Sequence, residues 1–249
     1  MISISIVSHN QGSLVNTLLN NLTHYGDPTC IEVILTLNVP ELLPIEVENA
    51  PYTITVVKNV TPKGFGANHN AAFRLAKGNR FCVLNPDIRL NDNPFPILLN
   101  EMEPQGAAVI SPAVLSLTGK LEDSVRRFPT LSSLAGKILG GDDGRYPFVI
   151  GDETFSADWV GGMFMLFQSD YFKRVGGFDE HFFLYYEDVD ICARLWNAGG
   201  RVLACPQVQV IHDARRTSRR NFRYLRWHVT SMLRYLLKHW GRLPRRAVS

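Results

Sequence analysis

Segments with strand-like and helix-like patterns alternate along the N-terminal part of the chain. The predicted strands are 2–8, 31–37, 53–57 and 80–84, and the predicted helices are 14–22, 68–76 and 94–102. Strands that alternate with helices favour a mostly parallel sheet flanked by helices, because each helix returns the chain to the start of the next strand. We therefore predict a doubly wound, Rossmann-like α/β fold.

Charge is distributed unevenly along the 249 residues. Residues 215–249 contain eleven Lys and Arg and no Asp or Glu, whereas residues 1–214 contain 15 basic and 23 acidic residues. With 45% hydrophobic residues the chain can bury a full core. We expect one α/β domain over 1–214 and a basic, amphipathic helical extension over 215–249.

The cysteines and the N-terminal sequence indicate the cellular compartment in which the protein is expected to act. Cys30, Cys82, Cys192 and Cys205 lack metal or redox spacing and lie among apolar neighbours, so we interpret them as reduced core residues of a cytosolic protein. The N-terminus carries no basic leader, and no apolar run approaches the roughly 20 residues that span a bilayer. Any membrane contact is therefore expected to be peripheral.

Polar residues follow the predicted strands, where open α/β sheets bind ligands. Ser8 and Asn10 follow the first strand, Asn38 the second and Asp87 the fourth. Asp87 could hold a divalent cation bound to phosphate, because Mg²⁺ often takes only one or two protein carboxylates. Taken alone, the tripeptide Asn-Pro-Asp at 85–87 is better explained as a turn.

The loop KGFGANHN at 63–70 precedes a predicted helix. Its glycines would allow a diphosphate to approach the backbone and the free N-terminal amides of that helix. The spacing differs from the P-loop and the dinucleotide fingerprint, and an ordinary turn explains two glycines equally well.

Six motifs occur in a recognisable order: SIVSHN, KGFGANHN, LNPD, SVRRFPT, GGFDEHFFLYYEDVDICARL and VQVIHDARR. Together they resemble family 2 glycosyltransferases of the GT-A fold, especially bacterial O-antigen rhamnosyltransferases. Those enzymes transfer L-rhamnose from dTDP-rhamnose to a saccharide linked to polyprenyl diphosphate. The resemblance covers essentially the whole chain and implies an inverting transferase that uses a divalent cation, Mg²⁺ or Mn²⁺.

The resemblance also implies roles for individual positions. Donor-binding positions are Ser8, Asn10, Asn38, Gly64, Phe65, Gly66, Asn68, Asn85 and Asp87. Asp87 matches the last residue of the family's metal-binding Asp-x-Asp motif, whose first residue is here Asn85, and His212 matches a position that can complete the metal site. The family more often has an Asp near Asn38. Arg126 and Arg127 suit diphosphate oxygens, and Gly161 and Gly162 match part of the acceptor site.

The stretch FFLYYEDVD at 182–190 sets carboxylates beside aromatic side chains. Helix electrostatics alone would make Asp188 a cap, pair Asp190 with Arg194, and leave Glu187 as a solvated neighbour. The aromatic run suits a sugar, and the resemblance implies that Asp188 is the base that deprotonates the acceptor hydroxyl, with Glu187 orienting the acceptor or tuning Asp188. A helix N-terminus is expected to keep Asp188 ionised.

The basic tail carries an apolar stripe at helical spacing. Its members are Phe222, Leu225, Val229, Met232, Leu233, Leu236 and Trp240. A helix of this kind could lie in an anionic membrane interface, pack onto the body or a partner subunit, or bind nucleic acid. We favour the anionic membrane surface over nucleic acid, because the lipid carrier implied by the resemblance lies in the inner leaflet.

The expected partners are a nucleotide-sugar donor, a polyprenyl-diphosphate-linked saccharide and the cytoplasmic face of the cell membrane, with a homodimer as an open alternative. Three other functions remain in competition: transfer from UDP-galactose or UDP-N-acetylglucosamine, a non-catalytic module that binds nucleotide sugar or lipid, and nucleotidyl transfer.

Overall fold

The computed structural model describes residues 1–43, 46–138, 140–141, 143–213 and 222–244. The boundary expected at 214–215, and the arginines at 215, 216, 219, 220, 245 and 246, lie outside these residues. In chain order, the strands are β1 (Ile2–Ser8), β2 (Ile31–Leu37), β3 (Thr53–Lys58), β4 (Arg80–Leu84), β5 (Ile88–Arg89), β6 (Ala107–Ser116), β7 (Val125–Arg126), β8 (Phe155–Ser156), β9 (Trp159–Val160), β10 (Phe164–Gln168) and β11 (Arg201–His212). The helices are α1 (Gly12–Tyr25), α2 (Glu46–Asn49), α3 (Phe65–Phe73), α4 (Phe95–Met102), α5 (Leu131–Ile138), α6 (Ser169–Arg174), α7 (Glu187–Asn197) and α8 (Phe222–Lys238).

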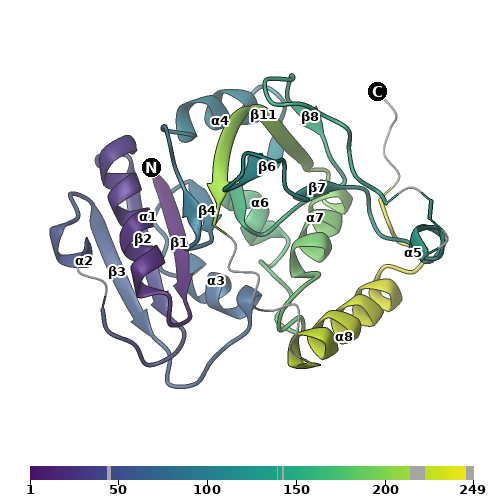
Figure 1. The fold of residues 1–249 in the computed structure, drawn as a ribbon, viewed down its shortest axis with the longest axis horizontal. Coiled ribbons are helices and arrows are strands. Elements are labelled where there is room, and N and C mark those ends of the chain that lie inside the picture. Colours follow the sequence, from purple (N-terminus) through teal and green to yellow (C-terminus); the bar gives the residue numbers. More distant parts are fainter. Residues whose placement is uncertain (44–45, 139, 142, 214–221, 245–249) are drawn as a thin grey trace.

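A central sheet with the strand order β3-β2-β1-β4-β10-β6-β11-β5 organises the fold. β3, β2, β1 and β4 run parallel, and β6 is parallel to β11. β10 lies antiparallel between β4 and β6 and joins these two halves. The predicted α/β fold with a mostly parallel sheet and flanking helices is therefore confirmed (Figure 1).

The elements predicted in the N-terminal part are present with small shifts at their ends. The largest shift is in α3, which was predicted over 68–76 and instead begins at Phe65 and ends at Phe73. The prediction treated Gly66 as part of a loop, but this glycine lies inside the first turn of the helix. Tertiary packing overrides the weak local preference of a single glycine.

Two apolar layers cover the sheet. One contains Leu18 and Leu22 of α1, and the other contains the aromatic cluster around Phe81, Phe167 and Phe172. Figure 1 shows α8 beside α7, on the side of the molecule away from β2 and β3.

The cysteines are free thiols, as predicted. Cys82, Cys192 and Cys205 are buried, whereas Cys30 is exposed, so its assignment to the core is wrong. Cys30 directly precedes β2 in a turn that its backbone amide closes by donating to the carbonyl of Asp27, and this places the residue at the surface. Among the described residues, no helix is both long and apolar enough to cross a membrane.

A buried amide ties α3 to the segment that leads toward α7. Asn70 Oδ1 accepts a hydrogen bond from the amide of Phe178 at 2.9 Å, and Asn70 Nδ2 donates to the Phe178 carbonyl at 2.9 Å and to Glu180 Oε1 at 3.0 Å. One side chain thus satisfies both backbone groups of a buried residue, which would otherwise lose hydration without compensation.

We expect Asn70→Ala to lower the free energy of unfolding by about 3 kcal/mol, because two backbone groups are left unsatisfied at roughly 1–3 kcal/mol each. Urea unfolding followed by circular dichroism measures the change. Asn20→Ala, at an exposed position of α1, is the matched control and should change stability little. Equal losses in the two variants would contradict the assigned role of Asn70.

Candidate active site

Side-chain amides gather where β2 and β3 end. Asn38 Nδ2 donates to the carbonyl of Lys63 at 3.0 Å, and Asn38 Oδ1 accepts from the Lys63 amide at 2.9 Å. Asn59 Nδ2 donates to Asn38 Oδ1 at 2.9 Å and to Asn68 Oδ1 at 2.7 Å. The three amides fix the loop that precedes α3, so Asn38 and Asn68 shape this end of the sheet.

Sequence analysis missed a carboxylate beside Ser8 and Asn10. Glu41 Oε2 accepts from Ser8 Oγ at 2.8 Å, and Glu41 Oε1 accepts from the Asn10 amide at 3.0 Å. Asn10 itself has a left-handed backbone with φ 60°. The signal that points to Glu41 is the acidic residue that the family more often carries near Asn38.

Gly64, directly before α3, and Gly66, in its first turn, pack against the protein itself. A Cβ on Gly64 would lie 2.6 Å from the carbonyl oxygen of Phe183, and a Cβ on Gly66 would lie 2.6 Å from Cβ of Phe178. The amide of Phe65 donates to the Phe183 carbonyl at 2.9 Å. The expectation that the first amides of this helix are free for a diphosphate is therefore wrong for Phe65, because its own chain occupies the approach.

The predicted metal ligands Asp87 and His212 come together at the ends of β4 and β11. His212 Nε2 lies 3.3 Å from Asp87 Oδ2, and His212 Nδ1 lies 2.7 Å from Glu122 Oε2. Burial lowers the pKa of His212, but hydrogen bonds and charges from Asp87 and Glu122 outweigh burial and raise the pKa to about 9. Asp87 Oδ1 is buried and has no hydrogen-bond partner. Glu122, which sequence analysis missed, orients the His212 ring.

Glu187 and Asp188 begin α7 directly after two residues with left-handed backbone. Tyr185 has φ 70° and Tyr186 has φ 67°, which is uncommon for residues other than glycine. Such a conformation costs free energy and persists only where the surroundings enforce it. Tyr186, rather than Asp188, is the residue before the first turn, and no side chain caps the helix.

The two carboxylates have different environments. Asp188 Oδ2 accepts from the Gly162 amide at 3.1 Å and Asp188 Oδ1 from the Val189 amide at 2.9 Å. Burial, reinforced by the charge of Asp188, raises the pKa of Glu187 well above its usual value. Burial also raises the pKa of Asp188, although its backbone hydrogen bonds oppose the shift. The interpretation of Glu187 as a solvated neighbour is therefore wrong, and the helix N-terminus does not outweigh burial at Asp188.

A cavity of about 900 Å³ opens in front of these carboxylates. Arg126 and Arg127 line it together with Glu187 and Asp188, as does His228 of α8. The cavity therefore combines cationic groups, which suit a diphosphate, with one partly exposed carboxylate.

The twelve other predicted site residues do not line this cavity. They are Ser8, Asn10, Asn38, Gly64, Phe65, Gly66, Asn68, Asn85, Asp87, Gly161, Gly162 and His212. Hydrogen bonds connect some of them to it. The Asn85 amide donates to the Met163 carbonyl at 2.9 Å, and the amide of the adjacent Gly162 donates to Asp188 at 3.1 Å. Gly161 donates to the Ser124 carbonyl at 2.8 Å and so holds the strand that carries Arg126.

Parts of the aromatic run expected to face a sugar contact α8, while Tyr185 and Tyr186 also line the cavity. The Phe183 and Trp227 ring centroids lie 4.7 Å apart, and Tyr186 lies 5.5 Å from Tyr235. Ser231 Oγ also donates to the Leu184 carbonyl at 2.9 Å. One of the three alternatives for the basic tail, packing on the body, is thus observed for α8.

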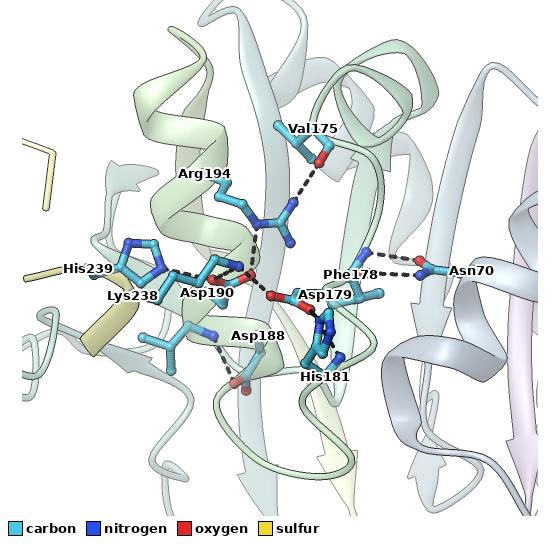
Figure 2. A network of polar contacts seen from close by, with 11 residues as sticks. Asn70, Val175, Phe178, Asp179, His181, Asp188, Asp190, Arg194, Lys238 and His239 are labelled. Atoms are coloured by element: carbon cyan, nitrogen blue, oxygen red, sulfur yellow. Dashed lines mark hydrogen bonds and ion pairs between the residues drawn. The ribbon is translucent and has the colours of Figure 1, made fainter. Parts of the chain in front are cut away.

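Asp190 is fully buried and connects α7 to α8, as Figure 2 shows. Its Oδ2 accepts from Arg194 Nε at 2.7 Å, and its Oδ1 lies 2.7 Å from Lys238 Nζ and 2.8 Å from His239 Nε2. Lys238 also lies 2.6 Å from Asp179 Oδ2. The predicted pair between Asp190 and Arg194 is present, but it is one part of a network that sequence analysis did not anticipate.

Comparison with known proteins identifies the family. Residues 3–230 match the family described as "Glycosyltransferase like family 2". The rhamnosyltransferase WbbL of Escherichia coli K12 is 32% identical, over 96% of this chain and 93% of that protein. An N-acetylglucosaminyl-diphospho-decaprenol L-rhamnosyltransferase of Mycobacterium tuberculosis is 30% identical, over 66% of this chain and 58% of that protein.

Solved structures support the fold. GalNAc-T7 with UDP, GalNAc and Mn²⁺ has a TM-score of 0.70 at 16% identity, over 96% of this chain and 48% of that chain. The mannosyltransferase PcManGT of Pyrobaculum calidifontis, with GDP-Man and Mn²⁺, has a TM-score of 0.64 at 15% identity, over 96% of this chain and 63% of that chain. With the family match covering most of its length, the chain belongs to the family 2 glycosyltransferases and has their GT-A fold.

Proposed function

We propose that this glycosyltransferase moves L-rhamnose, with inversion, from dTDP-rhamnose to a saccharide linked to polyprenyl diphosphate, in O-antigen or related polysaccharide assembly. The observation that carries the proposal is the 32% identity over nearly all of a rhamnosyltransferase, combined with Asp188 in a cavity that also contains two arginines. The name of the mycobacterial relative supplies the class of acceptor, a sugar diphosphate on a polyprenol.

The proposed reaction forms one bond and breaks another at the anomeric carbon. The acceptor hydroxyl attacks the face opposite the leaving group, its proton passes to Asp188, and the bond to the nucleoside diphosphate breaks. The raised pKa of Asp188 suits this role, because burial makes its carboxylate a stronger base than an exposed one. Burial raises the pKa of Glu187 and so favours its neutral form, which would limit the charge placed beside Asp188.

Donor binding is proposed at the carboxyl ends of β1, β2 and β4. Ser8, Asn10 and Asn38 would contact the nucleoside, with Glu41 as an additional acceptor for hydroxyl groups. Gly64 and the α3 residues Phe65, Gly66 and Asn68 would shape the pocket wall, and Asn85 its floor.

A divalent cation, Mg²⁺ or Mn²⁺, is proposed to bind at Asp87 and His212. The unpartnered Asp87 Oδ1 and the adjacent His212 Nε2 fit such an ion, because both atoms are ligands that Mn²⁺ accepts. Glu122 would hold the His212 ring in the binding orientation. No group of three or more metal-binding side chains occurs among the described residues, which fits an ion that also takes diphosphate oxygens. When bound, the cation would stabilise negative charge on the leaving diphosphate.

The outward face of α8 is proposed to rest on the anionic cytoplasmic face of the cell membrane. Six exposed apolar residues share this face, opposite the buried Ser231 and Tyr235: Phe222, Leu225, Val229, Leu233, Leu237 and Trp240. The helix contains no acidic residue. An apolar helix face flanked by arginines is the pattern of an interfacial helix.

The donor and the base are tested together. We expect dTDP-rhamnose with Mn²⁺ to raise the melting temperature more than UDP-galactose or UDP-N-acetylglucosamine does, and to release dTDP when the lipid-linked acceptor is added. Asp188→Asn should reduce release about 10²–10⁴-fold, since the base is lost. Glu187→Gln should reduce dTDP release less, because burial already favours the neutral form of Glu187.

Asp170→Asn, an exposed first-turn residue of α6, is the control and should keep wild-type turnover. A larger melting shift with a UDP-sugar would contradict the proposed donor. A folded Asp188→Asn enzyme with near wild-type turnover would remove Asp188 as the base.

The proposed cation site predicts that the stability of the metal-free protein depends on pH. Because the folded pKa of His212 is raised from 6.5 to about 9, its charged form stabilises the protein fully below pH 6.5, and this stability is lost as the pH rises through 9. We expect a loss of about 3 kcal/mol across this window in urea unfolding with a chelator present. His212→Gln should remove this part of the pH dependence, and an unchanged profile in that variant would contradict the assignment.

The membrane proposal is tested by sedimentation with vesicles containing phosphatidylglycerol at low salt. We expect the wild type to sediment with the vesicles. The Leu233→Asp, Leu237→Asp double variant should bind at least about tenfold more weakly, because charges replace apolar groups that would enter the membrane. Val149→Asp, at an exposed apolar position of the body, is the control. Failure of the wild type to bind, or an equal loss in the control, would defeat the proposal.

A further inference from the structure

A second, smaller cavity of about 340 Å³ adjoins the catalytic one. Pro129, Thr130, Ser132 and Leu243 line both cavities, so the two share a wall. The smaller cavity lies between the start of α5 and the C-terminal part of α8, and the residues that contact a ligand there would come from both helices.

Polarity changes from one cavity to the other. The catalytic cavity contains Arg126 and Arg127 with the carboxylates of α7. The smaller one is lined mainly by apolar groups, among them Leu131, Leu236 and Trp240. Leu131 is 50% exposed and Trp240 68% exposed, which are large apolar surfaces to leave beside a substrate cavity.

The smaller cavity also reaches the outward face of α8. Trp240 belongs to the exposed apolar residues of that face and also lines the cavity. A ligand could therefore extend from Asp188, past the arginines, into an apolar groove, and on toward the surface proposed to meet the membrane.

We infer that this groove binds the part of the polyprenyl chain nearest the diphosphate of the acceptor. The inference rests on the proposed function, and it assigns the groove to an acyclic isoprenoid joined to a diphosphate. Three properties support this occupant: the shared wall with the catalytic cavity, the cationic groups on the diphosphate side, and the continuity with the outward face of α8. The groove would select lipid-linked acceptors over free sugar diphosphates and direct the chain toward the bilayer.

Calorimetric titration of the full-length protein without membranes tests the groove separately from catalysis. The probes are farnesyl diphosphate and inorganic diphosphate. We expect the wild type to bind farnesyl diphosphate at least about tenfold more tightly, because only that probe buries apolar surface. The Leu131→Ser, Trp240→Ala double variant should lose most of this preference while keeping its affinity for inorganic diphosphate.

Val149→Ala is the matched control, because Val149 is 67% exposed and belongs neither to the groove nor to the outward face of α8. This control variant should keep the wild-type preference for farnesyl diphosphate over inorganic diphosphate. Equal affinities of the wild type for the two probes, or an equal loss of preference in the control, would overturn the inference.

The same variants, assayed with farnesyl-diphospho-N-acetylglucosamine and its methyl counterpart, separate this inference from the proposed function. The groove variant should raise KM about tenfold for the farnesyl acceptor alone, with kcat unchanged. Wild-type protein that binds farnesyl diphosphate preferentially but transfers no sugar would refute the proposed function and leave the groove standing.

Discussion

The buried carboxylate of Asp190 is the interaction on which the active-site geometry depends. A charge with no exposed surface persists only when it is paired and hydrogen-bonded. Burial raises the pKa of Asp190, but the hydrogen bond from His239 and the charges of Arg194 and Lys238 outweigh it and lower the pKa. Because two of these partners lie at the end of α8, the charge of α7 can be buried only when that helix is docked (Figure 2).

Docking of α8 has a direct consequence for the turn that leads into Glu187 and Asp188. The helix contacts Tyr185 through His228 and Tyr186 through Tyr235, and it fixes the carbonyl of Leu184 through Ser231. These contacts surround the two left-handed residues that precede the carboxylates. The basic tail therefore does more than carry positive charge, since one face of it holds the backbone that aims Asp188 into the cavity.

Sequence analysis predicted the N-terminal half of the sheet well, because regular periodicity over a few residues determines those strands and helices. It also paired Asp190 with Arg194, a contact within one helix. It did not find Lys238 and His239, nor Glu41 and Glu122, because their contacts join segments far apart in the chain. Burial determines the direction in which the pKa of Glu187 shifts, and the burial of a side chain cannot be predicted from a local pattern of charges.

The crowding of three carboxylates at 187–190 is resolved by giving each a different environment. Glu187 is enclosed without a donor for Oε2, and burial raises its pKa, whereas Asp190 is enclosed among cations that lower its pKa. Asp188 lies between these extremes, since burial raises its pKa while two backbone amides oppose the shift. A general base must gain a proton during the reaction and lose it afterwards, so a group fixed in either state serves poorly. Of the three, Asp188 alone is both partly exposed and at the wall of the cavity, which is the position that the proposed base requires.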